Sequence, residues 1–85
     1  ALHRAAQYGS TKVVNALLEK GASIDARTYS NQTVLHLAAL HGHSEAVNIL
    51  LEKGASIDAT DDKSRTALHL AALRGHTEVA KALLE

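Results

Sequence analysis

Histidines and adjacent carboxylates are the residues of this sequence whose types could support chemistry. Among the six histidines, His41 and His43 form the densest group, with His36 nearby. Imidazole is the commonest ligand of transition metals in proteins, so this group could hold a metal ion. Asp61 and Asp62 are neighbouring carboxylates, and paired carboxylates can carry out acid–base catalysis. Metal binding and catalysis are therefore the first two hypotheses to weigh.

The spacing of the histidines argues against a metal site. A residue that returns at the same position of every copy of a repeat serves the same structural purpose in each copy. No cysteine is present, and a three-ligand site would have to combine different copies. We therefore expect no metal, and a structural role for every histidine except His41. These five occupy two positions of a 33-residue repeat: His3, His36 and His69 in one, His43 and His76 in the other.

The surroundings of the carboxylates argue against catalysis. Asp61 and Asp62 lie in the polar stretch 60–65, and adjacent acids in an exposed turn are expected to be solvated, with ordinary pKa values. The serines and threonines lack the flanking glycines of a nucleophile elbow, and no glycine-rich phosphate-binding motif occurs. The sequence therefore predicts that the chain is not an enzyme and binds no cofactor.

Composition and charge exclude further classes of protein. The chain has 85 residues, a hydrophobic fraction of 46% and no Phe, Trp, Met, Cys or Pro, so its apolar residues are mainly Ala, Leu, Val and Ile. Such a composition suits closely packed helices in one small domain. No apolar run approaches the roughly 18 residues of a membrane span. The formal net charge is 0, which provides no excess of positive charge for binding nucleic acid.

An internal repeat decides the predicted architecture. When the sequence is shifted against itself by 33 positions, 30 of the 52 residue pairs are identical, and residues 17–26 recur unchanged at 50–59. The single domain 1–85 therefore divides into a partial repeat 1–26, a full repeat 27–59 and a partial repeat 60–85. Such units must stack side by side, usually about three of them, to bury a common core.

The pattern of the full repeat predicts two helices followed by an extended loop. A first helix is expected over about 34–41, with Thr33 as its N-cap and Gly42 ending it in the left-handed conformation. A second helix is expected over about 44–53, and Gly54 ends it. Its apolar residues cover more than half of its circumference, which indicates packing against neighbouring units.

The polar stretch between units is expected to form a protruding turn or hairpin. It runs from Gly54 to Thr66 in the second copy and is rich in residues that favour turns. Asn31 and Ser64 stand where such a turn requires a positive φ, which Asn adopts more readily than Ser.

The motif Thr33-Val34-Leu35-His36-Leu37-Ala38-Ala39, with Gly42-His43, Glu45, Leu50-Leu51 and Gly54-Ala55, resembles the ankyrin repeat, whose hallmark is T-P-L-H-x-A on a 33-residue period. Val34 and Ala67 replace the family's proline, at some cost in rigidity. The resemblance implies an all-α solenoid of stacked helix-turn-helix units with protruding hairpin loops. It also implies that the motif histidine hydrogen-bonds backbone and ties adjacent hairpins together, and that the protein is intracellular.

Positions at which the copies differ are candidates for binding a partner, because the stacking does not dictate them. They lie at the ends of the first helices and at the hairpin tips, which in ankyrin repeats line the concave face that docks proteins. Tyr and Arg are enriched at such interfaces. Tyr29 has an alternative role, resting its ring against the adjacent hairpin. The candidate partner-binding residues are Gln7, Tyr8, Arg27, Tyr29, Ser30, Gln32, Leu40, His41, Asp62, Lys63, Arg65 and Arg74.

These features favour a non-catalytic module that binds a protein partner. The alternative is a structural spacer within a longer array, or an engineered repeat scaffold without a ligand of its own. Both ends of the chain carry apolar residues where a terminal repeat prefers a polar outer face. End-to-end self-association through uncapped terminal repeats is therefore a further expectation, whereas nucleic acid and membrane are not expected partners.

Overall fold

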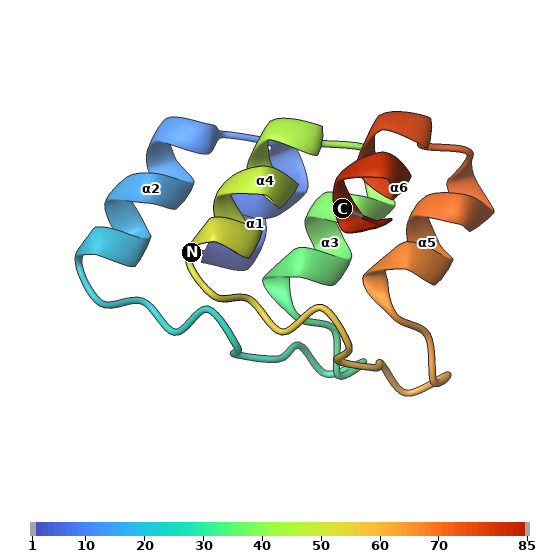
Figure 1. Cartoon of the computed structure of the whole chain (residues 1–85). Helices are drawn as coiled ribbons and strands as arrows, with labels where there is room; N and C mark the ends of the chain where they lie inside the picture. Colours follow the sequence, from blue (N-terminus) through green and yellow to red (C-terminus); the bar gives the residue numbers. More distant parts are fainter. Residues whose placement is uncertain (1, 85) are drawn as a thin grey trace.

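Two layers of short helices make up the structure, a computed structural model that describes residues 2–84 (Figure 1). Helices α1, α3 and α5 pack side by side in one layer, α2, α4 and α6 in the other, and the two helices of each unit pack on each other. No strand occurs within the described residues, so the predicted all-α solenoid is confirmed. The helices are α1 Leu2–Tyr8, α2 Thr11–Glu19, α3 Val34–Leu40, α4 Ser44–Glu52, α5 Ala67–Arg74 and α6 Thr77–Leu84.

The helix boundaries follow from their caps. The Thr33 hydroxyl accepts a hydrogen bond from the backbone N–H of His36, and the His36 ring accepts one from the backbone N–H of Thr33. This reciprocal capping box starts α3 where the sequence predicts. Gly42 adopts the left-handed conformation (φ 77°) just beyond its end. Both predicted helices of the full repeat end one residue earlier than expected, because His41 and Lys53 are the C-caps.

Small side chains allow the helices to approach closely around one continuous core. Ala6 and Ala39 have no exposed surface, and neither do Val47 and Leu50 of α4. A helix whose contact positions carry alanine can bring its axis nearer to its neighbour than one carrying larger residues. None of the helices within residues 2–84 is long and apolar enough to cross a membrane. Ala1 and Glu85, at the outer limits of the predicted terminal repeats, lie outside the described residues.

An imidazole resting on a glycine joins each pair of neighbouring units. The His43 ring lies so close to Gly9 that a Cβ on this glycine would be 2.6 Å from Nδ1. The Nε2 of His43 is 2.8 Å from the backbone oxygen of Gln7, to which it donates a hydrogen bond. One unit later, His76 lies over Gly42 in the same way. The glycine is therefore needed for space as well as for its positive φ.

The loops between units form the expected hairpins. In the first hairpin, the backbone N–H of Thr28 donates to the oxygen of Gln32 (2.9 Å), and the N–H of Asn31 donates to the oxygen of Thr28 (2.9 Å). Asn31 has φ 62° and Ser64 has φ 61°, which confirms the predicted positive values. A three-residue loop ending in the left-handed region is a common hairpin connection. The hairpins lie below the helices at the edge of the molecule in Figure 1.

Replacement of Gly42 tests the packing of the His76 ring on this glycine. Gly42→Ala places a Cβ 2.7 Å from the His76 ring at a positive φ, whereas Gly75→Ala meets nothing within 4 Å at a similar φ (71°). We expect Gly75→Ala to lower the free energy of unfolding by about 1–2 kcal/mol through backbone strain alone, and Gly42→Ala by a further 1–3 kcal/mol, roughly, through overpacking. Urea denaturation followed by circular dichroism measures both values. Equal losses of unfolding free energy in the two variants would contradict the packing of His76 on Gly42.

Candidate functional site

The tips of the two hairpins are tied to each other. The Arg27 guanidinium donates from Nη1 to the backbone oxygen of Asn31 in its own hairpin (2.9 Å) and to that of Thr60 in the next (2.8 Å). The backbone N–H of Asp62 donates to the oxygen of Ser30 at 3.1 Å. The Asn31 amide also donates to the Asp62 carboxylate at 2.9 Å. The two tips therefore form one continuous, internally fixed surface.

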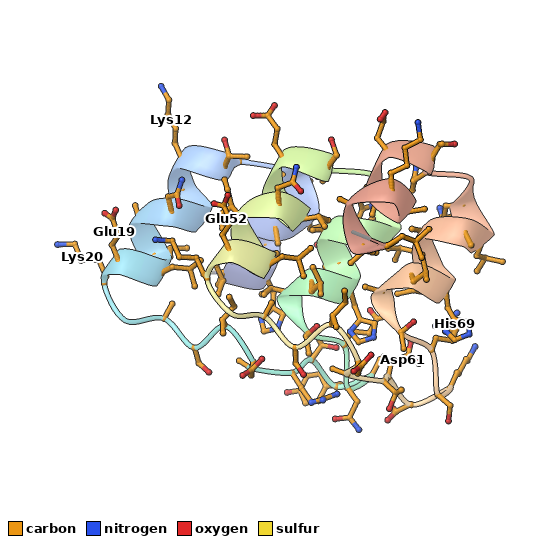
Figure 2. All side chains as sticks on the ribbon, viewed as in Figure 1. Lys12, Glu19, Lys20, Glu52, Asp61 and His69 are labelled. Carbon is orange, nitrogen blue, oxygen red and sulfur yellow. The ribbon has the colours of Figure 1, made fainter. Side chains whose placement is uncertain are left out.

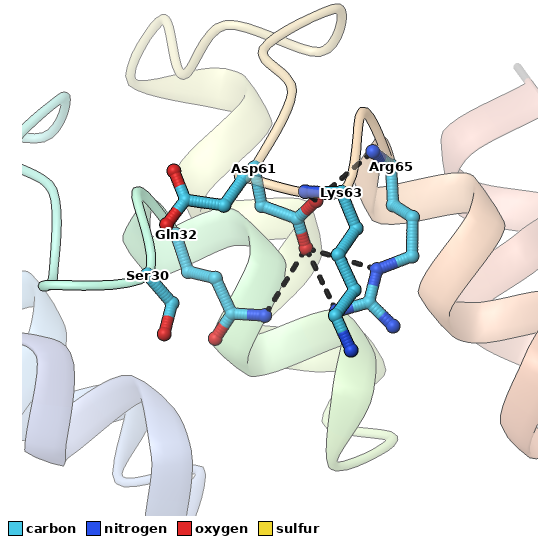
Figure 3. A pocket seen from close by; sticks show the side chains of 6 residues that line it. Ser30, Gln32, Asp61, Lys63 and Arg65 are labelled. Atoms are coloured by element: carbon cyan, nitrogen blue, oxygen red, sulfur yellow. Dashed lines mark hydrogen bonds and ion pairs between the residues drawn. The ribbon is translucent and has the colours of Figure 1, made fainter.

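A buried carboxylate holds the second tip in shape (Figure 3). The side chain of Asp61 is 1% exposed. Its Oδ1 accepts from the backbone N–H groups of Lys63 (2.9 Å) and Arg65 (3.0 Å), and its Oδ2 accepts from the Arg65 side chain (3.0 Å) and, at 3.4 Å, from the Gln32 amide. The expectation that Asp61 is a solvated acid is wrong, because the turn wraps its own donors around the carboxylate.

These contacts change the acidity of Asp61. Burial alone raises the pKa of this carboxyl. The hydrogen bonds from the backbone and guanidinium of Arg65, then from Lys63 and Gln32, outweigh burial and hold the pKa well below its ordinary value of 3.8. The ordinary pKa expected from its place in a polar turn is therefore wrong as well. Asp61 is a negative charge that the hairpin neutralises internally, and within residues 2–84 its pair with Arg65 is the one ion pair.

The predicted hairpin residues divide into two groups. Tyr29 is fully exposed, with a relative accessibility of 108%, so its ring does not rest against the adjacent hairpin. Ser30 and Lys63 are also exposed, and they border a hollow of about 220 Å³ between the tips. The side chains of the other predicted residues form hydrogen bonds within or between the hairpins: Arg27, Gln32, Asp62 and Arg65.

The second predicted group lies at the C-terminal ends of α1, α3 and α5. Tyr8 is 67% exposed, and His41 and Arg74 are exposed at the equivalent positions of the next units. Gln7 and Leu40 are partly buried, and their backbone oxygens accept hydrogen bonds from the histidines of the following units. In this group the side chains, and not the backbone, are available to a ligand.

The two groups lie at opposite ends of the helices (Figure 1). Helices α3 and α5 start directly after the hairpins, and α1, α3 and α5 end at the turns to their partner helices, so the length of a first helix separates the groups. Seven residues, as in α3, span about 10 Å. The structure therefore does not bring the predicted residues together as one cluster; it places them in two rows along one layer.

Arg4 is a further exposed residue of the first-helix layer, and the sequence prediction missed it. It lies one helical turn before Tyr8 on α1, so the two side chains share a face, and both are exposed. The signal was present in the repeat, because Leu37 and Leu70 occupy the equivalent positions and Arg4 differs from both.

The histidines have the structural roles that the repeat predicts. Within residues 2–84 no group of three or more His, Cys, Asp or Glu side chains could hold a metal ion. His36 joins its own helix cap to the next hairpin by donating from Nε2 to the backbone oxygen of Arg65 (2.8 Å). The other hydrogen bonds join His3 to Ala26, His43 to Gln7, His69 to Thr66 and His76 to Leu40.

His41, the histidine outside this pattern, lies among positive or protonatable groups. Partial burial lowers the pKa of His41, and His43, Arg74 and His76 lower it further. The His41 and His43 ring centroids are 6.4 Å apart. Partial burial, followed by repulsion from these neighbours, therefore lowers the pKa of His41 below that of an isolated histidine.

Stacked two-helix units, reciprocal Thr–His caps and tied hairpins define a helical repeat protein. The family model described as ankyrin repeats, in three copies, matches residues 2–85. The chain therefore belongs to the ankyrin-repeat family. Proteins of this family are generally non-catalytic modules of protein–protein interaction. A search of the curated proteins finds no match to this chain.

The acid response of the protein tests the role of Asp61. Because its native pKa is below 3.8, its contribution to stability is complete above that pH and is lost as the pH falls toward the native value. Asp61→Asn should lower the free energy of unfolding at neutral pH by about 1–3 kcal/mol, since an amide has one acceptor oxygen in place of two and no charge to pair with Arg65. It should also flatten the decline in stability below about pH 4. Urea denaturation across pH measures this.

The matched control for this experiment is Asp62→Asn. Asp62 is exposed and accepts one side-chain hydrogen bond, from Asn31, so this variant should keep the acid decline of the parent. An unchanged decline in Asp61→Asn would show that other carboxylates cause the acid sensitivity.

Proposed function

We propose that the chain binds a protein partner through the hairpin tips and the exposed face of α1, α3 and α5, called here the inner face. The inner face is defined by Arg4, Tyr8, His41, Leu73 and Arg74. The observation that carries the proposal is the internal fixing of the tips. Asp61 and Arg27 hold the two loops in shape, whereas Tyr29 projects fully into solvent.

The energetic reason is preorganisation. A loop that must become ordered on binding loses conformational entropy, which reduces its affinity. Here hydrogen bonds from Asn31 to Asp62 and from Arg27 to Thr60 already hold the neighbouring tips together. Tyrosine adds a large, stiff contact surface to such a frame, because its ring loses few rotamers on binding.

A matched pair of variants tests this function. Tyr8→Ala combined with Tyr29→Ala removes the two exposed rings without touching the core or the hairpin network. Lys12→Ala combined with Lys81→Ala alters two exposed positions on α2 and α6. Proteins captured from a lysate by the parent should also be captured by the lysine variant, and the tyrosine variant should lose them by about tenfold or more.

Mass spectrometry of the captured material gives the readout, and circular dichroism checks that each variant is folded. Equal capture by both variants would contradict the proposed surface. No capture by the parent would favour the alternative function, a spacer within a longer array or a scaffold without its own ligand.

We further propose that the terminal units associate end to end. Val13 is 48% exposed on α2, whereas the equivalent Ala46 and Val79 are buried. At the other end, Ala72 is exposed where the equivalent Ala39 has no exposed surface. These exposed positions are the ones that neighbouring units bury elsewhere in the chain, which favours contact between the two ends of separate copies.

Analytical ultracentrifugation across concentration tests this association. We expect the average mass to rise with concentration, and Val13→Glu combined with Ala72→Glu to keep the protein monomeric, because charged groups resist burial in an apolar contact. A strictly monomeric parent at all concentrations would contradict the proposal.

A further inference from the structure

The balanced net charge conceals a difference between the two layers, because the inner-layer helices carry positive charge without acids. The inner-layer helices α1, α3 and α5 contain no Asp or Glu at all. All the arginines of the chain lie either on α1 and α5 or in the hairpins. The described glutamates all lie on α2, α4 and α6, and lysines on the same helices or at their C-caps balance them in number. Figure 2 shows Glu19 and Glu52 together with Lys12 and Lys20 among the side chains of the outer layer.

On the inner face, positive side chains are exposed and no carboxylate of their own helices is present. Arg4 and Tyr8 are exposed one turn apart on α1, and Arg74 is exposed at the end of α5. Between them lies His41, whose protonation is resisted by partial burial and by neighbours that include Arg74. Leu73, next to Arg74, is 67% exposed and adds apolar surface. The inner face thus combines cationic, aromatic and apolar groups.

Of the acids in and beside the hairpins, Asp61 is neutralised within its own loop, whereas three others are exposed. Asp61 is buried, with both oxygens occupied by donors of its own loop and by Gln32. Asp62 is exposed, and its hydrogen-bond donor, the Asn31 amide, carries no charge. Lys63 is exposed beside them at the tip. The remaining nearby acids, Asp25 and Asp58, are exposed in the segments that lead into the hairpins.

The spacing of the positive groups distinguishes between kinds of anionic partner. Arg4 and Arg74 lie on α1 and α5, which are two helices apart. Packed helix axes are about 8–10 Å apart, so these arginines are separated by roughly 16–20 Å. Duplex DNA carries one charge per about 1.7 Å and is bound by closely spaced Lys and Arg. Widely spaced arginines separated by leucine and tyrosine suit a segment in which carboxylates alternate with apolar residues.

We propose that the partner of the inner face is an acidic protein segment whose carboxylates pair with Arg4 and Arg74 and whose apolar residues pack on Tyr8 and Leu73. This proposal rests on the function proposed above and names the chemistry of its partner. Arginine suits the task because its planar guanidinium can donate two parallel hydrogen bonds to one carboxylate. Charge complementarity also speeds association and rejects basic partners.

Selection from a displayed library of random peptides tests the proposal. The parent is compared with two double variants, Arg4→Glu/Arg74→Glu and Lys12→Glu/Lys81→Glu. Both variants change the net charge by the same amount, the first on the inner-layer helices and the second on the outer-layer helices. We expect the parent and the lysine variant to select peptides richer in Asp and Glu than in Lys and Arg. The arginine variant should bind the parent's selected peptide at least about tenfold more weakly in fluorescence anisotropy.

Several outcomes separate the proposals. In one outcome, the selected peptides lack an acidic excess and still lose binding to the Tyr8→Ala variant. This outcome overturns the acidic partner but leaves the protein-binding function standing. If no selected peptide depends on the inner face or on Tyr29 for binding, both the acidic partner and the protein-binding function are overturned. A single-stranded DNA oligonucleotide that binds as tightly as the selected peptide, and is lost in the arginine variant, overturns the peptide in favour of nucleic acid.

The replaced side chains are exposed, so the variants should fold as the parent does, which thermal unfolding checks. Arg4→Gln/Arg74→Gln provides a second, milder variant that removes the positive charge without reversing it. An intermediate loss of peptide affinity in this variant is expected, and an unchanged affinity overturns the proposal.

Discussion

The close approach of neighbouring units through alanine and glycine is the constraint on which the structure depends. Each unit buries its helices only against the next, so the distance between units sets how much apolar surface leaves water. Ala6 and Ala39 keep that distance short, and Gly9 and Gly42 leave space for the following imidazole. Because the same contact is used twice, one geometry serves both interfaces of the middle unit.

The hairpins inherit their order from this stacking. His36 donates to the backbone of the next hairpin, and Arg27 and Asn31 donate to groups of that hairpin as well. A loop of this length would be mobile if it were isolated, since its backbone would exchange hydrogen bonds with water. Adjacent units instead give each other the donors and acceptors they need. Recognition can then rest on side chains such as Tyr29 that the frame does not use.

Charge follows the same division between frame and surface. Asp61 and Arg65 form the ion pair that stabilises a tip, so their opposite charges largely neutralise each other. Arg4 and Arg74, in contrast, stand on helices without acidic residues. A net charge of zero therefore describes the whole chain and the outer layer, but not the inner-layer helices, which carry two arginines and no acid. The field that an approaching partner meets depends on which face it meets, because screening in salt limits charge effects to about 10 Å.

The sequence by itself determined the repeat, the two helices of the full repeat to within one residue, the Thr33 cap, the positive φ of Asn31 and Ser64, and the structural role of the repeated histidines. All of these depend on local rules or on the 33-residue period. Only the tertiary structure decided that Asp61 is buried, that Tyr29 is free, that Arg4 belongs to the exposed face, and that the predicted positions form two rows. These outcomes depend on how the folded backbone places groups around each side chain, within its own loop or from other units, and a single turn of sequence does not contain that information.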